Sequence, residues 1–157
     1  MSKIILSTLY QMKPSHLFYL TFFSVLILGS SFSDNKMTKV KIKISVNAQT
    51  FTATLLDNNS AKAFKEILPL TIKMTELNGN EKYCDLKKSL PTNPTNPKTI
   101  TNGDLMLYGS ETLVLFYKTF STSYSYTKLG QVDNTSGLAA ALGSGDVTIT
   151  FELEKGL

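Results

Sequence analysis

Few residues in this chain could do acid–base, nucleophilic or metal chemistry, because two of the usual side chains are scarce. The sequence contains no arginine, its sixteen basic residues are all lysines, and its single histidine, His16, lies in an N-terminal apolar stretch. Serine and cysteine nucleophiles commonly rely on a histidine, and imidazole is a frequent zinc ligand. Arginine supplies the planar fork that binds carboxylate or phosphate with two hydrogen bonds. We therefore predict no catalytic residue, no metal site and no cofactor.

Three serines at alternate positions, Ser121, Ser123 and Ser125, remain as candidate nucleophiles. A nearby lysine, Lys118 or Lys128, could in principle activate one of them. No motif around these residues supports such a pair, so we do not predict that they are catalytic.

Two carboxylates, Asp104 and Glu111, flank a predicted hairpin and could come within reach of each other as an acid–base pair. Polar residues at the ends of hairpins are far more often solvated turn residues. We adopt that interpretation.

Aromatic side chains cluster where hydroxyl side chains are also frequent, in residues 116–126. Tyrosine and phenylalanine among serine and threonine can form a recognition surface of flat apolar area with polar tips. The alternative is that these rings simply pack into a core. We take the candidate ligand-binding residues to be Tyr83, Phe116, Tyr117, Phe120, Tyr124 and Tyr126.

The elements that must position these rings are mostly strands. Alternation of apolar and polar residues predicts half-buried strands, and two near-continuously apolar segments, 104–108 and 112–117, predict a central hairpin buried on both faces. Closure into an antiparallel barrel or sandwich would protect the strand edges. The other strands are predicted over residues 39–46, 50–56, 70–74, 126–132 and 146–153.

Two short helices are predicted, over residues 61–68 and 137–142. The oxygens of residues 57–60 and of Thr135 and Ser136 are expected to cap them, and Pro69 and Gly143 to end them. Residues 76–99 carry no clear period and include three prolines. Such a long irregular segment is either a functional loop or a plain surface excursion.

The N-terminus resembles a secretory signal. Residues 17–28 form a short apolar run that follows two lysines, and small residues come after it. We therefore expect residues 1–33 to be a leader that is cleaved after Ser31 or Ser33, a domain over 37–157, and export to the periplasm or the medium. The run is short for a spanning helix, which favours a signal. The alternatives are an uncleaved membrane anchor and a cytoplasmic protein that starts at Met37.

The charge balance excludes one class of partner. Without Lys3 and Lys13, fourteen lysines face twelve carboxylates, so the net charge falls from +4 to about +2. The lysines are scattered, and those at 39, 41 and 43 would form the solvated face of a strand. We therefore predict no nucleic-acid binding, because a basic patch is the usual footprint of that function.

Six segments of the sequence carry a resemblance to a known family when they are taken in order. They are 51–55 (FTATL), 61–64 (AKAF), 68–70 (LPL), 77–83 (LNGNEKY), 103–109 (GDLMLYG) and 115–126 (LFYKTFSTSYSY). In this order they resemble bacterial cyclophilin-like fold proteins, over nearly all of residues 40–153. The resemblance implies a closed β-barrel with two helices, and the family name records a fold rather than an activity.

True cyclophilins isomerise the peptide bond before proline, and their catalysis depends on an arginine beside an aromatic pocket. This chain has the aromatic residues but no arginine, so the resemblance carries over no catalytic residue. We predict a mainly β, cyclophilin-like antiparallel barrel with two short helices that binds a peptide or small ligand in an aromatic groove without catalysis. The alternatives are a divergent peptidyl-prolyl isomerase and an interaction domain without a small ligand.

Overall fold

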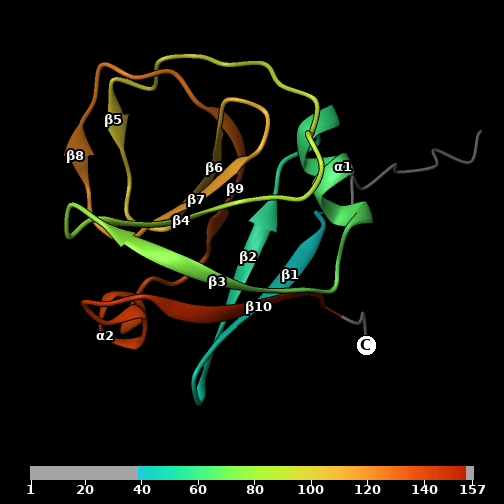
Figure 1. Cartoon of the computed structure of the whole chain (residues 1–157). Coiled ribbons are helices and arrows are strands. Elements are labelled where there is room, and N and C mark those ends of the chain that lie inside the picture. Colours follow the sequence, from blue (N-terminus) through green and yellow to red (C-terminus); the bar gives the residue numbers. More distant parts are fainter. Residues whose placement is uncertain (1–38, 155–157) are drawn as a thin grey trace, which may run out of the picture. The chain divides into compact units, whose positions relative to one another are not determined.

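The computed structural model describes residues 39–154, which form a closed antiparallel barrel (Figure 1). Eight strands close it in the order β1-β10-β3-β4-β7-β6-β9-β2, and each is antiparallel to both neighbours. The barrel strands are β1 (Lys41–Val46), β2 (Gln49–Leu55), β3 (Leu70–Leu77), β4 (Glu81–Asp85), β6 (Asp104–Tyr108), β7 (Thr112–Phe116), β9 (Thr127–Val132) and β10 (Val147–Leu153). The remaining elements of this part are a ribbon of β5 (Thr99–Ile100) and β8 (Phe120–Ser121), and the helices α1 (Asn59–Glu66) and α2 (Leu138–Leu142).

The predicted mainly β barrel with two short helices is confirmed, and every predicted strand is present within a few residues of its expected limits. The prediction that residues 76–99 are irregular is wrong in part. They contain the end of β3, all of β4 and the first residue of β5. The inward positions of β4 are occupied by Lys82 and Cys84 rather than by aliphatic residues, so its alternation is not visible as an apolar period.

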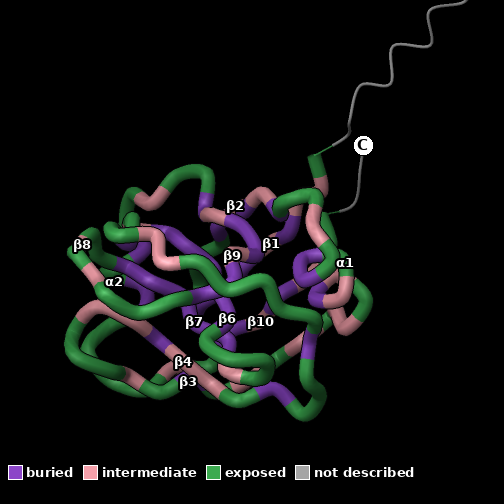
Figure 2. Tube along the Cα trace, turned by 90° about the horizontal axis from the view of Figure 1, so that it is seen from above, coloured by how far each residue is buried: buried purple, intermediate pink, exposed green. Residues whose placement is uncertain are grey.

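The barrel interior is filled by the inward-facing residues of the strands. Figure 2 shows buried positions along the strands and exposed positions on the surrounding loops. Helix α1 adds Phe64, whose ring centroid lies 5.9 Å from that of Phe151 on β10. The inward residues of β1, β6, β7 and β10 are Ile42, Ile44, Val46, Leu105, Leu107, Leu113, Leu115, Ile149 and Phe151.

A second apolar cluster lies on the outer face of β6 and β7. Met106, Val114 and Phe116 alternate with the interior leucines and pack with Ile100 of β5 and with Tyr126. The ribbon of β5 and β8 covers this side, and in both views it lies on the opposite side of the domain from α1 (Figures 1 and 2). The prediction that the hairpin is buried on both faces is therefore confirmed, and its outer cluster supports the candidate site.

The two helices begin differently. Asn58 caps α1 as expected, because its side-chain oxygen accepts a hydrogen bond from the backbone N–H of Ala61 at 2.8 Å. The predicted cap of α2 by Thr135 and Ser136 is wrong: Gly137 occupies that position with φ +80° and no side-chain hydrogen bond. Glycine adopts this left-handed backbone without the steric cost that a side chain would bring.

The predicted leader and its cleavage site lie outside the described residues, so export stays a prediction. Within residues 39–154, neither helix is long and apolar enough to cross a membrane.

Candidate functional site

An open groove of about 620 Å³ lies on the outer wall of the barrel, over β4 and β7. The side chains of Tyr83 and Val114 form part of its floor, since they alternate with the inward-facing Cys84 and Leu115. One wall is the segment that begins with β8 and ends at Tyr126. The groove therefore depends on the outer faces of the strands, while the barrel interior stays packed.

Aromatic rings contact one another in series along this wall. The centroid distances are 5.7 Å for Phe120–Phe116, 5.4 Å for Phe116–Tyr126, 5.7 Å for Tyr126–Tyr108 and 6.1 Å for Tyr108–Tyr124. Edge-to-face and tilted pairs at these distances each stabilise by about 0.5–1.5 kcal/mol beyond their buried area. The rings therefore pack against one another and stabilise this wall of the groove.

The irregular segment after β4, residues 91–98, is hydrogen-bonded to that wall. Thr95 and Tyr126 exchange two backbone hydrogen bonds, of 2.9 and 3.0 Å. The side-chain amide of Asn96 donates to the carbonyl of Ser123 at 2.8 Å, and the N–H of Thr122 donates to the carbonyl of Lys98 at 2.9 Å. Residues 91–98 do not line the groove, so this segment positions the wall without forming part of its surface.

The structure brings together four of the six predicted ring residues, because Tyr83, Phe120, Tyr124 and Tyr126 all line the groove. Phe116 is fully buried beneath them and contacts Phe120 and Tyr126. Tyr117 is separate, since it belongs to the interior cluster. Strand alternation explains this split: residues 114 and 116 face outward, so residue 117 faces inward.

Sequence analysis missed Tyr108, Glu81 and Asp85, which also line the groove. Tyr108 was included in a buried hairpin, yet 49% of its surface is exposed. Tyr108 follows the outward-facing Met106 by two residues, so strand alternation would have placed its side chain on the outer face. The two carboxylates were missed because β4 was not predicted.

The groove is acidic. Glu81 and Asp85 line it and no lysine does. Desolvation raises the pKa of Glu81, and the nearby carboxylate of Glu76 raises it further. The pKa of Tyr126 is also raised, first by desolvation and then by the negative charge of Glu81.

A matching family model confirms the resemblance to cyclophilin-like proteins. The model of the cyclophilin-like family matches residues 44–152. The chain belongs to the cyclophilin-like family. A solved structure with a similar fold is the solution structure of a hypothetical protein from Archaeoglobus fulgidus, with a TM-score of 0.52 and 14% sequence identity. The match covers 74% of this chain and 95% of that one, and at this identity it supports the fold alone. No curated protein matches the chain.

A serine–lysine pair and a metal site were considered in the sequence analysis, and neither was predicted. Within the described residues, no hydrogen bond joins Ser121, Ser123 or Ser125 to a lysine. Among those same residues there is also no group of three or more metal-ligating side chains close enough to hold an ion.

The two carboxylates at the ends of the central hairpin do not pair with each other. Asp104 pairs with Lys128 at 2.7 Å, whereas Glu111 accepts a hydrogen bond from the hydroxyl of Ser89 at 2.6 Å. The interpretation of both as solvated turn residues is wrong for Asp104, which is buried with its lysine partner, and holds for Glu111, which is exposed.

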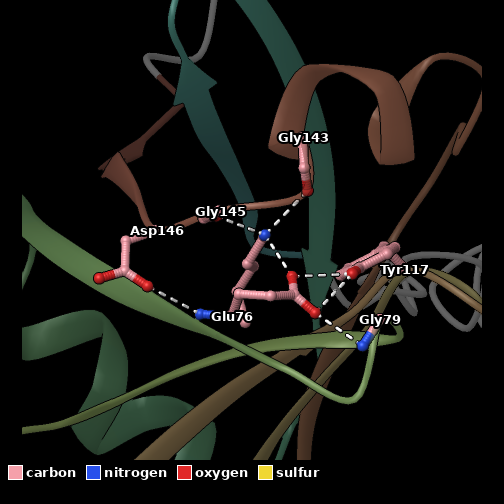
Figure 3. Close-up of polar contacts among 7 residues, drawn as sticks. Glu76, Gly79, Tyr117, Gly143, Gly145 and Asp146 are labelled. Carbon is pink, nitrogen blue, oxygen red and sulfur yellow. Dashed lines mark hydrogen bonds and ion pairs between the residues drawn. The ribbon is translucent and has the colours of Figure 1, made fainter.

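Lys82 is the centre of a buried polar cluster in the cyclophilin-like barrel, and Figure 3 shows its partners Glu76, Gly143 and Gly145. The ammonium group, which is fully buried, donates to the carbonyls of Gly143 at 2.9 Å and Gly145 at 2.7 Å, and it also pairs with the carboxylate of Glu76. Its three protons thus have three acceptors. Because the ammonium is fully used, we assign it a structural role and not that of a free nucleophile.

Tyr117 completes this cluster. Its hydroxyl donates to both oxygens of Glu76, at 2.9 and 2.8 Å, and its ring centroid lies 5.4 Å from the nitrogen of Lys82. Desolvation raises the pKa of Glu76, but the hydrogen bonds from Lys82 and Tyr117 outweigh it and leave the pKa below its ordinary value. Desolvation and the hydrogen bond to Glu76 raise the pKa of Tyr117 to about 12.

These shifts predict how the stability of the cluster depends on pH. The ionised Glu76 stabilises the fold above its ordinary pKa of 4.5, and this contribution is lost as the pH falls through the lower folded value. The neutral Tyr117 stabilises the fold below its ordinary pKa of 10.0, and its contribution is lost as the pH rises toward about 12.

The variant Tyr117→Phe tests the alkaline part of this prediction. It removes a hydrogen bond to a charged acceptor, so we expect it to lower the free energy of unfolding by about 1.5–3 kcal/mol at neutral pH. The difference from the unmodified protein should shrink between pH 10 and pH 12. Urea denaturation followed by circular dichroism at several pH values measures it, and a difference that stays constant over that interval would contradict the assignment.

Proposed function

We propose that this cyclophilin-like domain is a non-catalytic binding module that takes a peptide or a small ligand in the outer aromatic groove. The observation that carries the proposal is the exposure of large apolar side chains inside a concave site. Tyr124 is 61% exposed, Tyr108 49% and Leu77 40%, and all three line the groove. They are three of the five large apolar side chains that are exposed in residues 39–154.

The size and chemistry of the groove favour this class of function. Its volume falls within the range of about 300–1,000 Å³ that is usual for ligand sites. Contiguous exposed apolar surface rimmed by polar groups is typical of a binding site. Here the rings are rimmed by the amides of Asn78 and Asn80 and by the hydroxyls of residues 121–123.

The variant Tyr124→Ala is expected to weaken ligand binding by at least about tenfold while lowering the free energy of unfolding by no more than about 0.5–1.5 kcal/mol, the contribution of its contact with Tyr108. The ring is the most exposed of the large apolar side chains in the wall, so its loss removes contact area for a ligand but little buried packing. Binding is measured by NMR chemical-shift changes on the amides of the groove, with a library of small aromatic fragments and proline-containing peptides.

Leu56→Ala is the matched control, since Leu56 is 43% exposed and does not line the groove. It should leave binding unchanged. The proposal fails if no fragment or peptide shifts the resonances of the groove, or if the two variants affect binding equally.

A divergent prolyl isomerase is the alternative from another class. Preorganised donors often contribute a hundredfold or more to catalysis, and here the chain has no arginine and none of the lining residues is a lysine. A protease-coupled proline isomerisation assay separates the two functions. We expect no acceleration, and turnover at the level of a true cyclophilin would replace the binding-module proposal with the enzyme.

A further inference from the structure

We infer that the ligand of the outer groove carries an organic cation, namely an alkylammonium group on a small molecule or on the side chain of a lysine in a peptide. This inference rests on the proposed binding function and adds the chemical class of the ligand. It is based on the charges that line the groove, on the ion pairs elsewhere in the domain, and on the aromatic wall.

Most carboxylates of the domain have a lysine partner. Six of them form ion pairs: Asp57, Glu76, Asp104, Asp133, Asp146 and Glu152. Glu81 has neither an ion pair nor a side-chain hydrogen bond within the part of the chain that the structure describes, although its side chain is only partly exposed. The other carboxylates of that part without an ion pair, Glu66, Asp85, Glu111 and Glu154, are exposed, so Glu81 differs from them in being partly buried.

The position of Glu81 directs this unpaired charge into the groove. Its strand neighbour Lys82 faces the barrel interior, so Glu81 faces the outer wall together with Tyr83. In the register of β4 and β7 it lies opposite Phe116, which supports Tyr126 from below. Its negative charge is close enough to Tyr126 to raise the pKa of that hydroxyl. The carboxylate therefore lies beside the aromatic wall.

Asp85 adds a second negative charge four residues after Glu81, on the same face of β4. One of its oxygens accepts a hydrogen bond from the hydroxyl of Thr112 at 2.7 Å, and it has no lysine partner among the described residues. A lysine does come near the β3–β4 turn, where the nitrogen of Lys118 lies 3.9 Å from the place that a Cβ on Gly79 would occupy. Lys118 does not line the groove.

Three classes of ligand would meet this surface differently. An anion would face two carboxylates and no lysine. A neutral ligand would remove water from Glu81 without replacing it, and further desolvation of an unpaired charge is costly. An alkylammonium group would pair with Glu81 and also lie against the negative faces of the tyrosine rings. The groove is thus complementary to the cation.

The test compares pairs of ligands of nearly equal shape. Choline is matched with its neutral analogue 3,3-dimethylbutan-1-ol, and a capped Gly-Lys-Gly peptide is matched with the same peptide containing norleucine. Dissociation constants come from NMR titrations that follow the amides of Tyr83, Tyr124 and Tyr126. We expect at least one cation to bind about tenfold or more tightly than its neutral match. The arm that shows this preference distinguishes a small molecule from a peptide.

The variant Glu81→Gln is expected to abolish the preference for the cation and to leave the neutral ligands unaffected. Glu66→Gln is the control, because Glu66 is exposed on α1 and does not line the groove. This substitution changes the net charge by the same amount as Glu81→Gln. We also expect Glu81→Gln not to lower the melting temperature. An unpaired, partly desolvated carboxylate does not favour folding, whereas loss of a structural ion pair would lower the melting temperature.

Each remaining outcome decides against the inference in a distinct way. If cations and their neutral matches bind equally, or if Glu66→Gln has the same effect as Glu81→Gln, the charge of the groove does not select its ligand and only the inference fails. If neither these probes nor the neutral fragments and peptides shift the groove resonances, the proposed binding function fails with it.

Discussion

Replacing Lys82 with methionine is expected to lower the free energy of unfolding by about 3–5 kcal/mol. Methionine has a similar length and fills the same space, but it cannot donate to Glu76 or to the carbonyls of Gly143 and Gly145. Those acceptors would then lie beside an apolar side chain and lose their donor. Breaking a buried ion pair by removing one partner is costly because the other charge stays desolvated.

Urea denaturation measures this loss, and Lys43→Met is its matched control. Lys43 pairs with Glu152 at 2.7 Å, but the two side chains are 45% and 39% exposed. An exposed pair of this kind contributes no more than about 1 kcal/mol. A double variant, Lys82→Met with Glu76→Gln, should lose less than the sum of the single variants, because the two residues act as one unit. If Lys82→Met is no more damaging than Lys43→Met, the buried cluster does not stabilise the barrel as described.

Replacing Gly130 with alanine is expected to lower the free energy of unfolding by about 3 kcal/mol, at the upper end of the usual cost of overpacking. A Cβ on this residue of β9 would come closer than 3.0 Å to the carbonyl oxygen of Thr54 and within 3.1 Å of the Cα of Leu55. Both atoms belong to the backbone of β2, which pairs with β9 at this point. Relief would require the two strands to separate at the seam that closes the barrel.

Gly145→Ala provides the control for this substitution. A Cβ at position 145 would have no neighbour within 4 Å, and this glycine does not occupy the left-handed region of the backbone. We expect a change within about 0.5 kcal/mol for Gly145→Ala. Equal unfolding free energies for the two alanine variants would show that β2 and β9 are less closely packed than the structure indicates.

The fold could be predicted from the sequence wherever one face of a strand is aliphatic. In β1, lysines and serine alternate with Ile42, Ile44 and Val46, and the structure places the aliphatic residues inside. Strand β4 could not be predicted in this way, because its inward side chains include a lysine that is stabilised by partners distant in the sequence. Gly143 and Gly145 lie more than sixty residues from Lys82, so no local pattern could have indicated its burial.

The candidate site could be predicted only in part, for the same reason. The density of rings in residues 116–126 indicated the groove wall, and Tyr124 and Tyr126 lie there. Local spacing did not show that Tyr117 faces the interior, although extending the alternation of β7 by one residue would have indicated it. The acidic side of the groove depends on the pairing of β4 with β7, which is a long-range contact and not a local pattern.

The position of the groove on the outer wall has a consequence for how this domain can evolve. Interior leucines of β6 and β7 maintain the barrel, while the residues that would recognise a ligand lie on the outer faces of β4, β6 and β7, in the β3–β4 turn, and in the segment from β8 to Tyr126. Most substitutions at exposed positions change stability little. Residues 121–124, which are largely exposed, can therefore diversify while the barrel is conserved. In such a domain the residues that would select a ligand can change while the residues that stabilise the barrel stay the same. One architecture can then accommodate sites for many different ligands.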